Sequence, residues 1–319
     1  MKHKLSLLCA LCALFALLRA SDQVIESCRY GLRLCAELIV PSLFPFFVLS
    51  LLLSKLGLPA LLGQLLAPAA KRLFRVSGAG VTALPVGLCG GYPLGAVYVA
   101  ELERGGQITA QEGARLLAFC NNSGPAFIVG AVGVGVFGSA ALGLRLYAIH
   151  CAAALLVGLL LRGFGSDSPS PAVPPAPAPS VSFSRALGEA VEGAVHALLR
   201  VCGFAVCFTA FTGLLDANGF FPAAAAFLSG RLGLEAGWCR ALLCGLLELG
   251  SGAGALRGLP ATPLNLALAA GLLGWGGLSV QFQTLAVLSE SDIKGALPVA
   301  GRLMSAICSV LLALLFFRS

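Results

Sequence analysis

The pentad NNSGP, residues 121–125, places two amides and a hydroxyl directly before a glycine and a proline. It lies in a stretch that carries no charged residue between Arg115 and Arg145. Amide and hydroxyl side chains can hydrogen-bond a polar solute. A helix that restarts after Gly124 and Pro125 turns its N-terminus, which favours negative charge, toward the same point. This combination indicates a binding site for an anionic or carbonyl-rich solute.

Helix-breaking residues also interrupt three other apolar parts of the chain. They are PSLFPFF (residues 41–47), CGGYPLGA (89–96), and ELGSGAG (248–254) together with WGGLSVQFQ (275–283). An unpaired backbone group costs several kcal/mol in hydrocarbon, so broken helices are tolerated only where protein or trapped water satisfies them. We therefore expect the interruptions to surround a polar cavity near the middle of the membrane.

The candidate substrate-binding residues lie in these interruptions. They are Gly91, Tyr92, Asn121, Asn122, Ser123, Gly124, Gly277, Ser279 and Gln281, and Gln283 belongs to the same polar stretch. The rival interpretation is structural, because Asn, Ser and Gln also hold membrane helices together by interhelical hydrogen bonds. The sequence leaves both interpretations open.

Glu248 is the acidic residue placed inside a broken segment. Acidic side chains are expensive inside a membrane and are by default suspected of function, so Glu248 is the candidate to carry a coupling proton or to bind Na⁺. The alternative is an ion pair with Arg240 or Arg257. His150 and His196 stand alone without ligand spacing, and we interpret both as helix contacts.

No arrangement of residues supports covalent or metal chemistry, so we expect neither an enzyme nor a bound cofactor. The segment GVGVFG (residues 133–138) matches a dinucleotide-binding fingerprint, but that motif needs a preceding strand and a soluble helix after it. Most of the 12 cysteines lie in apolar runs, where cysteine behaves as a small hydrophobic residue.

The composition is that of a polytopic membrane protein. Hydrophobic residues make up 58% of the 319 residues and charged residues 11%, against roughly 25% charged in soluble domains. The lipid bilayer is therefore an expected partner. The net charge of +7 is spread thinly, which argues against nucleic-acid binding.

Uncharged runs recur at the length that a membrane helix needs, which is about 17–25 residues. Three shorter runs lie between Arg145 and Arg162, between Arg200 and Asp216, and between Arg302 and Arg318. We expect these helices to extend past a flanking charge whose side chain reaches the membrane surface.

The chain divides into four predicted parts. Residues 1–23 form an N-terminal membrane helix, 24–163 a first repeat, 164–182 a linker rich in Pro, Ser and Ala, and 183–319 a second repeat. The first part is not interpreted as a cleaved signal peptide, because Leu18 stands where a small residue is wanted. Residues 38–57 align weakly with 200–219, and residues 109–124 align with 262–277 without a gap. Repeats with matching interruptions are typical of secondary transporters.

Four stretches in this order, PSLFPFFVLS, GGYPLGA, CNNSGPAFIVG and GGLSVQFQ, resemble the YlbJ-type sporulation integral membrane proteins, which carry nucleoside-recognition or Gate domains. The resemblance covers nearly the whole chain after the first helix. It implies an all-α fold like that of the concentrative nucleoside transporters, with two repeats and broken helices. It also implies a role in endospore formation, in moving dipicolinate across the outer forespore membrane.

The resemblance carries functional roles only onto positions that match its motifs. These positions are Gly90 to Pro93, Asn121 to Gly124, and Gly276, Gly277, Ser279 and Gln281. Phe282 stands where the family often has histidine, so no role is carried over there.

We therefore predict a transporter or permease of the bacterial cell membrane, whose substrate is a small organic anion, foremost dipicolinate. A nucleoside transporter is the first alternative; it needs carboxylates for ribose hydroxyls and a Na⁺ site, for which only Glu248 fits. The second alternative is a membrane scaffold of the spore envelope. Whether the chain forms a homo-oligomer stays open.

Overall fold

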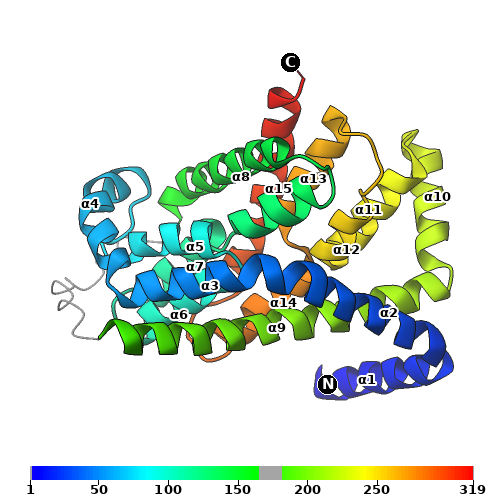
Figure 1. Cartoon of the computed structure of the whole chain (residues 1–319), viewed down its shortest axis with the longest axis horizontal. Helices are drawn as coiled ribbons and strands as arrows, with labels where there is room; N and C mark the ends of the chain where they lie inside the picture. Colours follow the sequence, from blue (N-terminus) through cyan, green and yellow to red (C-terminus); the bar gives the residue numbers. More distant parts are fainter. Residues whose placement is uncertain (1, 165–181, 319) are drawn as a thin grey trace.

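The computed structural model describes residues 2–164 and 182–318, and all regular structure in these two ranges is helical (Figure 1). The first range contains α1 (Lys2–Arg19), α2 (Ser21–Leu34), η1 (Cys35–Ile39), α3 (Val40–Lys55), α4 (Leu58–Leu73), η2 (Gly80–Thr82), α5 (Ala83–Gly90), α6 (Leu94–Arg104), α7 (Ala110–Cys120), η3 (Ala126–Val134), α8 (Ala140–Leu160) and η4 (Leu161–Gly163). The second contains α9 (Phe183–Ala217), α10 (Phe220–Leu232), α11 (Ala236–Leu247), α12 (Leu249–Gly254), α13 (Pro263–Trp275), α14 (Gly277–Leu288) and α15 (Ala296–Phe316). All but the two end residues of the predicted linker lie outside the described residues.

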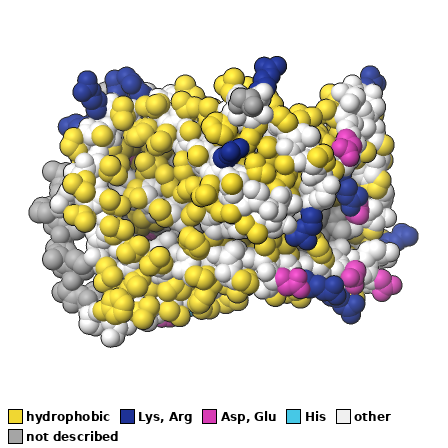
Figure 2. Space-filling view, turned by 45° about the horizontal axis from the view of Figure 1, so that its top comes forward, with side chains coloured by type: hydrophobic (Ala, Val, Ile, Leu, Met, Phe, Trp, Pro, Cys, Tyr) yellow, Lys and Arg dark blue, Asp and Glu magenta, His cyan; other side chains and the backbone are white. Residues whose placement is uncertain are grey.

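The helices have the length and composition of membrane spans. Within the described residues, five helical segments are long and apolar enough to cross a bilayer: Ser21–Lys55, Ala140–Gly163, Phe183–Ala217, Pro263–Leu288 and Ala296–Phe316. Figure 2 shows apolar side chains over most of one face, with most of the charged side chains near its upper left corner and along its right side. A surface of this kind matches lipid rather than water. The expected polytopic all-α membrane protein is confirmed.

The same order of elements occurs on both sides of the undescribed segment. A long helical segment (Ser21–Lys55, which ends in α3, and α9) is followed by a shorter helix (α4, α10), then by two interrupted helices, and then by another long helix (α8, α15). Gly57 and Gly219, which the sequence alignment pairs, both precede their short helix in the left-handed conformation. Thr109 and Thr262 are also paired by the alignment. The side-chain oxygen of Thr109 caps α7, and that of Thr262 caps α13. These matches support the two-repeat hypothesis, whose boundaries stay a prediction.

Two long helices frame the molecule on one side. Helices α3 and α9 run side by side (Figure 1), and Lys55 Nζ lies 2.6 Å from a carboxylate oxygen of Glu189 between them. Small residues of α9, among them Ala186, Ala190 and Ala194, are fully buried and allow this close approach. The interrupted helices pack between this frame and the long helices α8 and α15.

The first expected interruption is not a break. Pro41 and Pro45 both lie within α3, and the chain reaches that helix through one widened turn, the π-helical segment η1. Proline removes a backbone donor and clashes with the preceding turn, and a π-helical turn is one way in which a helix accommodates such a misfit. The other interruptions are real breaks.

Candidate functional site

The first pair of broken helices crosses at its two breaks. Helix α5 ends at Gly90, where Gly91 takes a φ of +78°, and α7 ends at Cys120 before η3 begins at Ala126. A Cβ atom on Gly91 would lie 2.7 Å from the backbone nitrogen of Gly124. The crossing therefore requires glycine at position 91, both for its backbone conformation and for the space.

The second pair crosses in the same way. Helix α11 ends at Leu247, α12 begins at Leu249, and Glu248 between them is extended. Helices α13 and α14 meet at Gly276, and Gly277 has a φ of +79°. A Cβ on Gly277 would lie 2.9 Å from the nitrogen of Leu249. Each half thus contributes one crossing to the core.

Side chains satisfy backbone groups that the breaks leave without a helical partner. The N–H of Ser123 donates to His150 Nε2 at 3.1 Å. The amide of Gln281 donates to the Trp275 carbonyl at 2.8 Å.

Glu248 caps α12 with both carboxylate oxygens. One oxygen accepts from the N–H of Gly250 at 2.9 Å and the other accepts from the N–H of Ser251. These contacts meet the requirement that buried backbone groups find partners inside the protein.

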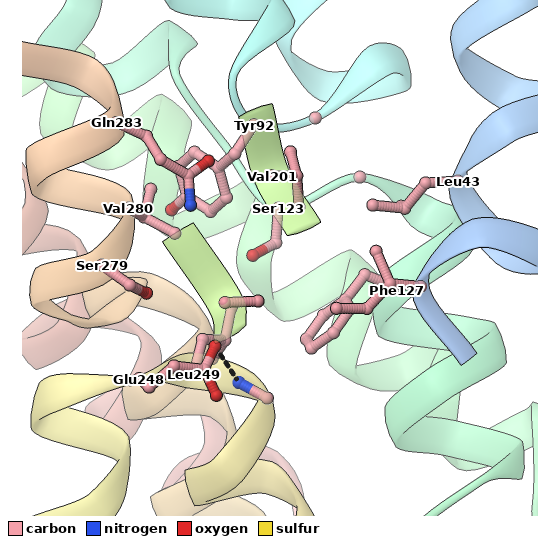
Figure 3. Close-up of a pocket in the computed structure, with 15 residues that line it drawn as sticks. Leu43, Tyr92, Ser123, Phe127, Val201, Glu248, Leu249, Ser279, Val280 and Gln283 are labelled. Atoms are coloured by element: carbon pink, nitrogen blue, oxygen red, sulfur yellow. Dashed lines mark hydrogen bonds between the residues drawn. The ribbon is translucent and has the colours of Figure 1, made fainter. Parts of the chain in front are cut away.

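A cavity lies between the two crossings and the helical frame (Figure 3). It offers about 60 Å³ to the centre of a water-sized sphere, several times the roughly 10–15 Å³ that one water needs by this measure. Its apolar wall consists of Ile39, Leu43, Phe127, Val201 and Ala205. The remaining lining is Gly91, Tyr92, Ser123, Gly124, Glu248, Leu249, Gly250, Ser279, Val280 and Gln283. Ligand sites commonly have this form, with a mostly apolar wall and a few convergent polar groups.

The structure brings six of the predicted site residues to the cavity: Gly91, Tyr92, Ser123, Gly124, Glu248 and Ser279. In Figure 3 the hydroxyl groups of Ser123 and Ser279 point toward the central space. Gln283 is buried and its carbonyl oxygen has no hydrogen-bond partner among the described residues. An unpaired buried amide oxygen at a cavity is available to accept a hydrogen bond from a ligand or a trapped water.

Four predicted site residues are not among those lining the cavity. Asn121 donates to the Thr284 hydroxyl at 2.9 Å, and Asn122 donates to the Phe119 carbonyl at 2.7 Å. Gly277 forms the second crossing, and Gln281 binds the Trp275 carbonyl. These contacts favour the structural interpretation for these four residues. That they bind the substrate stays a prediction.

The ionisable side chains near the breaks have local partners. Arg240 pairs with Asp216 at 3.0 Å, and the carboxylate of Glu248 is used in capping α12 rather than in an ion pair with Arg240. His196 contacts the carbonyl of Glu192 in its own helix at 2.9 Å. His150 is buried and accepts a hydrogen bond from the backbone N–H of Ser123 at the break.

Arg302 is a buried functional candidate that is not among the residues predicted from the sequence. The expectation that charges flanking the short runs reach the membrane surface fits Arg145 and Arg200, which are exposed, but it is wrong for Arg302, which is 2% exposed.

The guanidinium of Arg302 donates to three groups. Its Nη1 donates to the Tyr92 hydroxyl at 2.7 Å, and its Nη2 donates to the carbonyl of Ala118 at 3.2 Å and to Asn122 Oδ1 at 3.3 Å. A signal was present, because the uncharged run from Arg302 to Arg318 is too short to span a bilayer, so the helix had to continue through Arg302.

Comparisons with known proteins agree with the helical membrane character. The chain is 33% identical over 315 residues to the sporulation integral membrane protein YlbJ of Bacillus subtilis (strain 168), a match that covers 92% of this chain and 77% of that protein. No family model matches the chain, and no solved structure matches it. From its similarity to that relative along most of both chains, this protein belongs to the YlbJ family of sporulation integral membrane proteins.

Proposed function

We propose that the protein is a secondary transporter for a small organic anion. The observation that carries the proposal is the cavity, because both pairs of broken helices line it: Tyr92 and Ser123 come from the first half, and Ser279 comes from the second. Broken helices from two halves that meet at a buried site are typical of secondary transporters, which expose such a site alternately to the two sides of the membrane.

Dipicolinate is the proposed substrate, and endospore formation is the proposed occasion. Dipicolinate is a planar dianion with a ring nitrogen, so it needs an apolar wall for its ring and donors for its carboxylates. The side chains of Leu43, Phe127 and Val201 offer such a wall. The charged group that contacts the Tyr92 hydroxyl is the buried guanidinium of Arg302. Its positive charge attracts an anion, whereas a carboxylate there would repel one. The family's link to sporulation supports the same substrate and a location in the outer forespore membrane.

Glu248 is the proposed site of ion coupling, by a proton or by Na⁺. It lines the cavity and is 5% exposed. A buried carboxylate that meets a transport cavity can change its charge or bind a cation as the site opens to either side. No homo-oligomer is needed for this mechanism.

The experiment that tests this function uses a Bacillus subtilis strain that lacks its own YlbJ protein. The strain receives this chain, the variant Ser279→Leu, which fills the cavity, or the control Ser289→Leu, which makes the same substitution at an exposed position at the end of α14. The dipicolinate content of the spores is measured, with equal protein levels shown by immunoblot. We expect the wild-type chain and Ser289→Leu to restore dipicolinate, and Ser279→Leu to fail.

The other results point to other functions. Restoration by all three chains would mean that the cavity is not a substrate site and would favour the scaffold. Failure of the wild-type chain, at normal abundance, would contradict dipicolinate as substrate. Uptake of labelled uridine would then test the nucleoside transporter.

A further inference from the structure

Arg302 is a buried cation without a matching anion. None of the ion pairs formed by the described residues includes Arg302, and its Nε finds no acceptor among them. Its known partners are a phenol, a backbone carbonyl and an amide oxygen, all uncharged. Burying a charge is costly unless it is paired and hydrogen-bonded. A positive charge held in this way close to a cavity favours an anion there.

Tyr92 connects Arg302 to the cavity. Tyr92 lines the cavity, and its hydroxyl oxygen accepts a hydrogen bond from Arg302 at 2.7 Å. The carbon of the guanidinium lies 5.8 Å from the centre of the same ring. Because the phenol oxygen accepts from the arginine, the phenol's own hydrogen is left to donate elsewhere. A cation on the oxygen also withdraws electron density and makes that hydrogen a stronger donor.

The neighbouring groups complete a small polar wall. Gln283 lines the same cavity as Tyr92 (Figure 3), and its amide oxygen has no partner among the described residues. The Ser279 hydroxyl also lines the cavity. Gly276 leaves space for the phenol, since a Cβ there would lie 3.1 Å from the Tyr92 hydroxyl. The Tyr92 phenol, the Ser279 hydroxyl and the NH₂ group of Gln283 are donors that a carboxylate can use, whereas the unpaired oxygen of Gln283 can only accept.

We propose that Tyr92, held and polarised by Arg302, donates to a carboxylate of the transported solute. Arg302 is then a positioning residue that makes the cavity select carboxylates over uncharged molecules of the same shape. The inference rests on the proposed transport function but does not require dipicolinate itself. The same donor would serve any small planar carboxylate whose ring lies against Leu43 and Phe127.

The test measures binding to the purified full chain in lipid nanodiscs by isothermal titration calorimetry. The ligands are dipicolinate, the monocarboxylate picolinate, the uncharged pyridine-2,6-dicarboxamide, and uridine. The variants are Tyr92→Phe, which keeps the ring, and Arg302→Gln and Arg302→Lys. Tyr147→Phe is the matched control, because that hydroxyl donates to the Leu88 carbonyl at 3.1 Å and Tyr147 is not among the residues that line the cavity.

We expect wild type and Tyr147→Phe to prefer the carboxylates. Tyr92→Phe should lose roughly ten- to a hundred-fold in carboxylate affinity, as expected for a charge-assisted hydrogen bond, and change little for the dicarboxamide. Arg302→Gln should lose the preference, and Arg302→Lys should recover part of it. If Tyr92 and Arg302 had a purely structural role, their substitution would lower the affinity for all four ligands equally.

The remaining results separate the failure of this inference from the failure of the transport proposal. If wild type prefers carboxylates and both Tyr92→Phe and Arg302→Lys keep that preference in full, the inference is wrong while the transport proposal stands. If Arg302→Gln does not fold, Tyr92→Phe and Arg302→Lys still decide whether the preference for carboxylates depends on this pair. If wild type binds picolinate but not dipicolinate, the inference survives and the proposed substrate fails. If it binds uridine alone or no ligand, both fail.

Discussion

Buried polar side chains in this protein have two distinct tasks, and neighbouring residues can differ in which one they perform. Gln281 and Gln283 are both buried in α14. Residues two positions apart in an α-helix point in directions that differ by about 200°. Gln281 therefore reaches the Trp275 carbonyl, while Gln283 lies at the cavity. The polar stretch could be predicted from the sequence, but the direction of each side chain depends on how the helix is rotated in the packed core, which one sequence does not determine.

Substitution of these two glutamines should separate the tasks. Gln283→Leu is expected to lower dipicolinate affinity by roughly ten-fold or more, because the NH₂ group that can donate to a charged carboxylate is lost, with little change in thermal stability. Gln281→Leu should instead destabilise the fold by about 1–3 kcal/mol, because the Trp275 carbonyl loses its donor. Binding calorimetry and thermal unfolding of the purified variants measure the two effects. The assignment is wrong if Gln281→Leu weakens binding without any loss of stability.

Glu248 combines a capping contact with a place at the cavity. In Glu248→Gln one of the two acceptor oxygens becomes a donor, so we expect a stability loss of about 1 kcal/mol, typical of a damaged N-cap. We also expect loss of solute accumulation driven by an ion gradient, while exchange of labelled for unlabelled solute across the membrane continues. Accumulation at the wild-type level would show that Glu248 is a cap alone.

The breaks in the helices are the elements that build the site. Their positions could be predicted, because glycine and proline inside apolar stretches mark them. Their crossing could not be predicted, since it depends on the approach of backbones that lie far apart in the sequence, such as Gly277 against Leu249. The widened turn η1 before Pro41 was also missed, because proline signals a disturbed helix without saying whether the helix breaks or only widens.

The crossing can be tested by adding one methyl group. Gly91 has a φ of +78° and a ψ of −170°, a region essentially restricted to glycine, and its Cβ would meet Gly124. Gly91→Ala should therefore cost several kcal/mol and leave little folded protein. Gly106→Ala is the control, because Gly106 has a φ of +65° with nothing within 4 Å of its Cβ, and it should cost only about 1–2 kcal/mol. Equal stability of the two variants in thermal unfolding would argue against the crossing.

At the scale of the whole molecule, the two halves interlock rather than sit side by side. Arg302 of the second half binds Tyr92 of the first, and Asn121 of the first half binds Thr284 of the second. Helices α3 and α9 add an ion pair between the halves at Lys55 and Glu189. Composition and apolar runs were enough to predict a helical membrane protein. The interlocking is not predictable, because the sequence pattern places its central charge, Arg302, at the edge of an uncharged run.

This interlocking predicts that the halves assemble without a covalent link. Residues 1–164 and 182–319, expressed together as separate chains, should co-purify through a tag on either one and retain dipicolinate binding. Each half expressed alone should be poorly folded, because it exposes its part of the polar core to lipid. Stable, monodisperse halves that do not associate would be incompatible with the arrangement described here.

The central claim is that the cavity between the crossed helices carries an organic anion through the membrane. The most direct measurement is uptake of radiolabelled dipicolinate into liposomes that contain the purified chain, compared with empty liposomes and with liposomes that contain Ser279→Leu. The account predicts saturable uptake with wild type and only background uptake with Ser279→Leu. Wild-type uptake no greater than that of empty liposomes, under proton and Na⁺ gradients of either direction, would contradict it.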